Sequence, residues 1–148
     1  MADFIYNIAK GRFAHWYTLP AASDALVVVP IEATGVEADD VLNNYDDLLA
    51  LLAAANNEQT TMGRKTVTAS VTVTVNDTTN LVDVDFPDQT WVGATGNGVS
   101  DLIVCYDPDT GAGTDSTLLP MDHHDFVTTP DGSDITAQLA AAGSARAA

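Results

Sequence analysis

The sequence has little cysteine, few basic residues and no long apolar run. Its single cysteine, Cys105, cannot form a disulfide within the chain, and its apolar neighbours predict a buried strand residue. Lys and Arg number 5 against 21 Asp and Glu, so the net charge is −16 at pH 7. Such a surface repels phosphate backbones and anionic lipids, and we expect neither nucleic acid nor membrane as a partner. The longest apolar run, near 25–31, is too short to span a bilayer, and the start does not resemble a signal peptide.

The length and composition predict one folded domain made in the cytoplasm. With 148 residues, of which 46% are apolar and 18% charged, the chain can bury one hydrophobic core. We expect an N-terminal arm or short helix over 1–20 and a β-sandwich-like domain over 21–139. The small, alanine-rich residues of 140–148 predict a flexible tail.

The N-terminal segment differs from the rest of the chain. Residues 1–17 carry a net charge of +1, which leaves −17 on the remainder, and they hold half of the ten aromatic residues. Aromatic and basic side chains often supply the energy of protein interfaces. We therefore expect this segment to dock on a neighbour through Phe4, Tyr6, Lys10, Arg12, Phe13, Trp16 and Tyr17. The alternative is an arm or short helix that packs on its own domain.

Hydrophobic periodicity predicts one helix near the middle of the chain. Apolar residues recur at spacings of three, four and seven within 37–55, which is typical of an amphipathic helix. The residues of this face are Val41, Leu42, Tyr45, Leu48, Leu49 and Leu52. Thr34 and Glu37 have the spacing of a capping box.

Alternation and turn residues predict strands elsewhere. Residues 25–32 read as a strand that Pro30 confines to a sheet edge or a strand end. The alternation over 66–75 predicts one long strand, paired in a hairpin with 82–86. Its core-facing residues are expected to be Val67, Val71, Val73 and Val75. Further strands are expected at 90–92, 101–106, 117–120, 125–128 and 134–139. Together these favour a mainly β (α+β) fold, an antiparallel β-sandwich or small barrel with one amphipathic helix and an N-terminal aromatic arm.

Candidate sites for chemistry are weak in the sequence. The loop 107–115 resembles a calcium loop in its spaced carboxylates, but its twelfth position is Leu118 and strands flank it. The run 122–125, Asp-His-His-Asp, offers four ligand types, of which about two can face one ion, so a third ligand has to come from elsewhere. The glycines of 93–98 lack the lysine of a phosphate loop. We predict no catalytic residues, no cofactor and no metal.

The order of these segments resembles a family of virion structural proteins of tailed bacteriophages. The resemblance runs from about Phe4 to Phe126 and rests on order rather than on a catalytic motif. Its segments are Phe4-Ile5-Tyr6-Asn7, Asp24 to Val29, Arg64-Lys65, Val82-Asp83-Val84-Asp85, Thr90 to Gly93, Val104 to Asp107 and Asp115 to Pro120. Some members of that family are described as head decoration or minor capsid proteins.

The resemblance implies a non-enzymatic capsid decoration (cement) protein on the outer shell of a phage head. Its partners would be the major capsid protein or other virion subunits, and it would form a homo-oligomer, with a trimer favoured. One alternative is a tail tube, tail terminator or connector component. Another is a carbohydrate- or calcium-binding β-sandwich module, with Trp91 or Trp16 as a stacking surface and the loop 107–115 as an ion site.

Overall fold

The fold is mainly β and antiparallel, as the sequence predicts. The computed structural model describes residues 3–78, 81–138 and 145–147. Its elements in chain order are β1 (Phe4–Ile5), α1 (Phe13–Tyr17), β2 (Ala25–Glu32), α2 (Asp39–Leu42), α3 (Leu48–Ala53), β3 (Lys65–Val67), β4 (Thr72–Asn76), β5 (Leu81–Asp85), β6 (Gln89–Trp91), β7 (Val99–Asp107), β8 (Leu119–Thr128), β9 (Ile135–Ala137) and β10 (Ala145–Ala147). Within the described residues, three short helices accompany three sheets, which gives a sandwich-like α+β fold.

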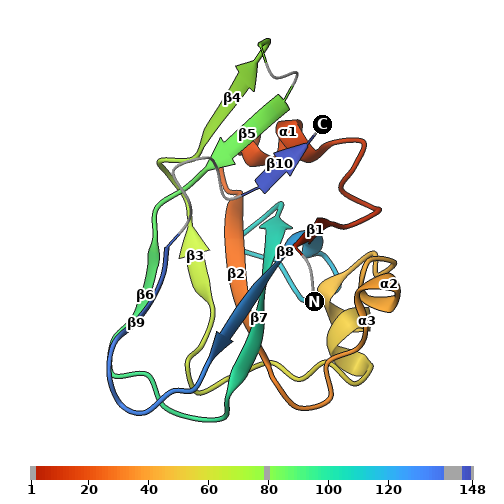
Figure 1. The fold of residues 1–148 in the computed structure, drawn as a ribbon. Coiled ribbons are helices and arrows are strands. Elements are labelled where there is room, and N and C mark those ends of the chain that lie inside the picture. Colours follow the sequence, from red (N-terminus) through yellow and green to blue (C-terminus); the bar gives the residue numbers. More distant parts are fainter. Residues whose placement is uncertain (1–2, 79–80, 139–144, 148) are drawn as a thin grey trace.

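The three sheets have different sizes and places in the molecule (Figure 1). The largest has the strand order β1-β8-β7-β2-β3, and the others are β10-β5-β4 and the ribbon β6-β9. The hairpin of β4 and β5 projects at the top, with α1 and β10 beside β5. Among the described residues, the helices are all too short to cross a membrane.

The core is built on β2 and β7, the central strands of the large sheet. Almost every residue of both strands is buried, because side chains on both faces meet other parts of the chain. This explains why both strands read as nearly continuous apolar runs rather than as alternating ones. Cys105 lies in β7 and is fully buried, as expected. Burial raises the pKa of its thiol, which keeps it protonated and unreactive.

Pro30 lies inside the large sheet rather than at its edge. The pairing of β2 with β3 covers only Leu26 to Val28, and beyond it the segment around Gln59 takes the place of β3. The Gln59 N–H donates to the Pro30 carbonyl at 2.8 Å. In an antiparallel strand the backbone N and O of one residue point to the same side. The nitrogen of Pro30 therefore points toward the Gln59 segment and away from β7. Its lack of an N–H removes no hydrogen bond between β2 and β7.

The single helix expected over 37–55 is wrong, because the structure has two short helices there. Asn43 ends α2, and the Asp47 carboxylate caps α3 by accepting the Ala50 N–H at 2.7 Å. Polar side chains between them offer the backbone partners that compete with helical hydrogen bonds. Because of the break, Val41 and Leu49 are 43% and 53% exposed rather than buried.

The predicted capping box is also absent. Ala38, which has no capping side chain, precedes α2. Glu37 instead accepts hydrogen bonds from Tyr45 Oη at 2.7 Å and Asn56 Nδ2 at 2.8 Å. These contacts tie the start of α2 to the segment after α3.

The long strand expected over 66–75 is wrong as well. It is divided into β3 and β4, which belong to different sheets. Ser70 has a φ of +62°, a left-handed conformation that interrupts an extended strand. Val67 is buried and Val71 and Val73 are half-buried, but Val75 is 67% exposed on the projecting hairpin. The hairpin itself is confirmed, with Asn76 paired to Leu81.

The remaining expected strands occur with shifted bounds. The segments 117–120 and 125–128 are joined in the single strand β8, while 90–92, 101–106 and 134–139 correspond to β6, β7 and β9. Of the tail expected to be flexible, Ala145–Ala147 form β10 and pair with β5. Residues 140–144 and 148 lie outside the described residues.

Candidate functional site

The N-terminal aromatic segment packs mainly on its own domain. Tyr6, Phe13 and Tyr17 are at most 3% exposed and belong to the core. Phe4 and Trp16 are half-buried, and their rings stack on His123 and Tyr106 with centroids 4.6 and 5.9 Å apart. A buried side chain offers no surface to a partner, so the three core aromatics do not anchor a neighbour in this conformation.

The basic residues of the segment remain on the surface. Lys10 and Arg12 are exposed and line an open hollow of about 440 Å³. Its other lining residues are Gly11, Phe13, Ala14, His15 and Val82. We call this region the basic hollow. Val82 belongs to β5, so the hollow lies where the N-terminal segment meets the projecting hairpin.

A second group of polar residues lies on β8, next to β1. Alternation along the strand sends Asp122 and His124 to one face of the sheet and His123 and Asp125 to the other. Asp122 and His123 are nevertheless both buried, because each face of β8 is covered. The predicted run of ligands is thus divided into two pairs.

The first pair is a charged network under the N-terminal segment. The Tyr17 hydroxyl donates to Asp122 in a short hydrogen bond, and His124 Nε2 lies 2.9 Å from Asp122 Oδ1. His124 Nδ1 is 3.7 Å from Asp3. Burial lowers the pKa of His124, but the Asp122 and Asp3 carboxylates outweigh it and raise this pKa to about 9. The His124 side chain is therefore positively charged at neutral pH and links the N-terminal segment to β8.

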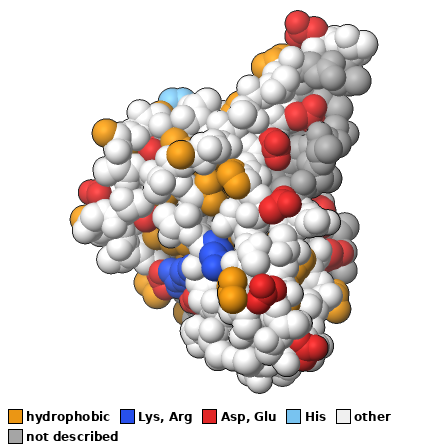
Figure 2. Space-filling model, turned by 90° about the vertical axis from the view of Figure 1, so that its left-hand side faces the viewer, with side chains coloured by type: hydrophobic (Ala, Val, Ile, Leu, Met, Phe, Trp, Pro, Cys, Tyr) orange, Lys and Arg blue, Asp and Glu red, His pale blue; other side chains and the backbone are white. Residues whose placement is uncertain are grey.

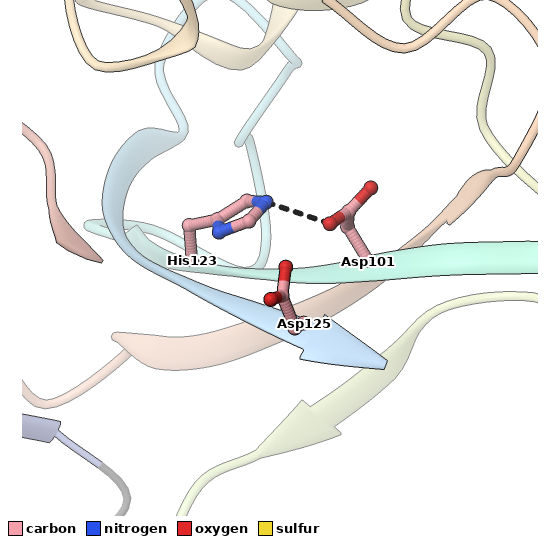
Figure 3. A group of neighbouring side chains, drawn as sticks. All are labelled: Asp101, His123 and Asp125. Atoms are coloured by element: carbon pink, nitrogen blue, oxygen red, sulfur yellow. Dashed lines mark ion pairs between the residues drawn. The ribbon is translucent and has the colours of Figure 1, made fainter. Parts of the chain in front are cut away.

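The second pair meets an aspartate of the neighbouring strand (Figure 3). Asp101 of β7 is paired directly with Asp125, and His123 lies two residues before Asp125 on the same face of the sheet. One ligand atom from each of Asp101, His123 and Asp125 lies within 4.8 Å of the others. Asp101 and His123 are fully buried, whereas Asp125 is exposed, so the cluster reaches from the core to solvent.

The sequence predicts two of the three residues of this cluster. The face shared by His123 and Asp125 follows from strand alternation, and the need for a third ligand from elsewhere follows from the count. Asp101 reads in the sequence as the first residue of an expected strand, and only the register of β7 against β8 brings it beside Asp125. The signal that could mark it is a carboxylate at the start of a strand whose following residues, 102–106, are apolar.

The loop 107–115 directs its carboxylates inward to its own backbone or to Arg64. Asp107 and Asp109 each accept a backbone N–H two residues further on, from Asp109 and Gly111. Both Asp115 oxygens accept from Arg64, at 2.5 and 3.0 Å, and this contact lowers the pKa of the Asp115 carboxyl. The three carboxylates therefore serve as turn and ion-pair partners in this conformation.

We predict that Ca²⁺ at millimolar concentration leaves the melting temperature of the protein unchanged. A ligand that binds the native state stabilises it by mass action, so a Ca²⁺ site at this loop would raise the melting temperature. Thermal unfolding with and without Ca²⁺ makes the test. A rise of several degrees that Asp109→Ala abolishes would show that the loop binds calcium.

The glycine-rich segment 93–98 forms a turn around a buried glutamine. Gln59 is 1% exposed, and its Nε2 donates to the Asn97 carbonyl at 2.6 Å. A Cβ at Gly96 would lie 2.6 Å from Gln59 Nε2, and Gly96 has a φ of +114°. This glycine is required by the close approach of Gln59 and by its backbone conformation.

Comparison of the chain with protein-family models, curated proteins and solved structures finds no match.

Proposed function

We propose that this chain is a non-enzymatic virion structural protein that decorates the outer shell of a tailed-phage head. The order of segments described above supports this role, as does the mainly β fold. The protein would assemble in the host cytoplasm and remain in the capsid as a homo-oligomer, with a trimer favoured. Its partner would be the major capsid protein or another virion subunit.

The observation that carries the proposal is a basic, partly apolar surface on a strongly acidic protein. Figure 2 shows acidic side chains spread over one face of the molecule, including the projecting hairpin, with basic and hydrophobic side chains also present on that face. The basic hollow instead presents Lys10 and Arg12 beside Val82. Val82 is paired directly with Val75, which is 67% exposed, so both side chains lie on one face of the hairpin. We propose that the basic hollow and Val75 together dock on an acidic region of the shell.

Charge explains why many copies would bind the shell and not each other indiscriminately. With a net charge of −16, the bodies of neighbouring copies repel one another. At the basic hollow, positive charge and apolar side chains coincide, so attraction to an acidic surface is expected there. Complementary charge of this kind directs orientation and raises the rate of association.

We predict that Lys10→Gln with Arg12→Gln weakens attachment to particles by about 10-fold and reduces its dependence on salt, since rim charges act on association and its salt dependence. Both side chains are exposed, so the variant should keep its melting temperature. The matched control is Thr60→Glu with Thr95→Glu, two exposed positions that change the net charge equally. Sedimentation of each protein with particles that lack it measures the affinity. Equal binding by variant and control would refute the docking surface.

Copy number separates decoration from the tail alternative. Mass spectrometry of purified particles should find the chain in fixed ratio to the major shell protein, and sedimentation equilibrium should find a discrete trimer. A tail tube, terminator or connector component would instead occur in few copies or form stacking rings. Absence of the chain from purified particles would refute any virion role.

The carbohydrate-module alternative loses one of its two stacking surfaces. Trp91 is 2% exposed, and its Nε1 donates to the Gly63 carbonyl at 2.8 Å. Lys65 Nζ lies 5.6 Å from the centre of the Trp91 ring. A ring covered in this way cannot stack on a sugar. Trp16, half-buried against Tyr106, is the remaining candidate.

A further inference from the structure

The Asp101, His123 and Asp125 cluster places two carboxylates in direct opposition across β7 and β8. Directly paired residues of an antiparallel sheet have their side chains side by side on one face, and like charges there are destabilising. A cation between them would remove the repulsion. The imidazole of His123 lies on the same face and points toward Asp101 (Figure 3).

The contact between His123 and Asp101 has the distance of an ion pair without the alignment of a hydrogen bond. His123 Nε2 lies 2.9 Å from Asp101 Oδ1, yet neither atom has an aligned hydrogen-bond partner. His123 Nδ1 is also buried without a partner. An unsatisfied buried polar group costs about 1–3 kcal/mol, so a fully buried imidazole with both nitrogens unsatisfied requires an explanation.

Two ligand atoms of one metal ion lie at such a distance without being aligned for a hydrogen bond. Ligand atoms at about 2.0–2.2 Å from one metal ion lie roughly 3 Å apart, and their lone pairs point at the ion rather than at each other. The His123–Asp101 distance fits this arrangement closely.

His124 Nε2 and Asp122 Oδ1 also lie 2.9 Å apart without an aligned hydrogen bond, so the distance alone does not mark an ion site. His123 differs in that both of its ring nitrogens are buried without a partner and in that a third ligand residue, Asp125, lies nearby. Phe4 stacks on the His123 ring and holds it in place.

We propose that Asp101, His123 and Asp125 form a binding site for a divalent first-row transition-metal ion of the zinc class. Asp101 and His123 supply an oxygen and a nitrogen from the core side. Asp125 supplies a second oxygen at the solvent side, where water completes the coordination. The ion joins β7 to β8 and neutralises the opposed carboxylates, so its role is to stabilise the sheet.

The ligand chemistry discriminates between ions. Imidazole and carboxylate together suit Zn²⁺ and its first-row neighbours, whereas Ca²⁺ takes six to eight oxygen ligands. With one nitrogen among three protein ligands, Ca²⁺ and Mg²⁺ should bind much more weakly than Zn²⁺. The site is independent of the basic hollow and of the proposed virion role, so either proposal can fail without the other.

The test uses the full chain without an affinity tag, stripped of metals with a chelator. Isothermal titration with Zn²⁺ should give one bound ion per chain, and Zn²⁺ should raise the melting temperature by mass action. An equal concentration of Ca²⁺ should give neither result.

Matched variants assign the binding to the cluster. Asp125→Asn changes an exposed ligand and should weaken Zn²⁺ binding by about 100-fold or more, since even the loss of an outer-shell partner costs roughly 10- to 100-fold. His123→Gln should abolish binding. The controls are Asp109→Asn and His15→Gln, which make the same changes at exposed positions outside the cluster and should bind like the unaltered protein.

Either of two results would overturn the proposal. One is the absence of Zn²⁺ binding at millimolar concentration, which would leave a direct contact between His123 and Asp101 as the whole content of the cluster. The other is binding that Asp125→Asn leaves unchanged but His15→Gln removes, which would assign it to a surface histidine. Because Asp125 is exposed, its variant gives a result even if His123→Gln does not fold.

Discussion

Leu48→Ala should lower the free energy of unfolding by about 2–5 kcal/mol, whereas Leu49→Ala should lower it by less than about 1 kcal/mol. The two residues are adjacent in α3, but Leu48 is fully buried and Leu49 is 53% exposed. Truncating a buried leucine removes its transfer free energy and leaves a cavity, and an exposed leucine loses little of either. Denaturant titration of both variants measures the difference.

The position of α3 explains why Leu48 is costly to truncate. Its backbone N–H donates to the Leu118 carbonyl at 3.0 Å, so the start of the helix is fixed to the segment that enters β8. Leu118 and Leu51 are also buried in the same core. The surroundings are therefore held on several sides and cannot collapse into the cavity. Equal losses for Leu48→Ala and Leu49→Ala would mean that α3 is not attached to the sheet in this way.

The short-range sequence patterns predicted where strands occur better than they predicted which strands belong to the same sheet. The alternation around Val73 and the apolar run of β7 both correspond to strands, because side-chain burial alone sets these patterns. The same alternation continues through Ser70, whose left-handed backbone divides it between two sheets. Nothing in the period of the sequence marks that break, since it depends on which strand each half pairs with.

The prediction of one helix over 37–55 is wrong for a related reason. The apolar spacing over 37–55 fits one helix, but Asp47 supplies a cap in its middle. Asp and Asn side chains compete with helical hydrogen bonds for backbone groups, and they interrupt a helix where tertiary contacts stabilise a turn. Here the hydrogen bond from the Leu48 N–H to the Leu118 carbonyl stabilises the start of α3.

The cluster of Asp101, His123 and Asp125 also depends on contacts between elements that the local sequence does not show. His123 and Asp125 were predictable from one strand, while Asp101 required the pairing of two.

Deletion of residues 1–17 should abolish cooperative folding rather than release a stable body. Tyr6, Phe13 and Tyr17 are core residues, and truncating one large buried aromatic costs about 3–5 kcal/mol. Three such losses approach the whole stability of a typical domain, about 5–15 kcal/mol. The deletion also removes β1 from the edge of β8. Circular dichroism during heating should show no unfolding transition.

Comparing this deletion with the Lys10→Gln and Arg12→Gln variant separates the two roles of residues 1–17, which are packing in the core and docking on a partner. Lys10→Gln with Arg12→Gln keeps every buried aromatic, so it should melt as the unaltered protein does while binding particles less tightly. Tyr17→Phe tests the core side alone, because it leaves the ring and removes the hydroxyl that donates to the buried Asp122. A buried hydrogen bond to a charged group contributes about 1.5–3 kcal/mol, and that loss should appear in unfolding and not in binding. A truncated chain that melts cooperatively near the temperature of the full chain would show that the segment is an arm, and its aromatics would then return as candidates for the docking surface.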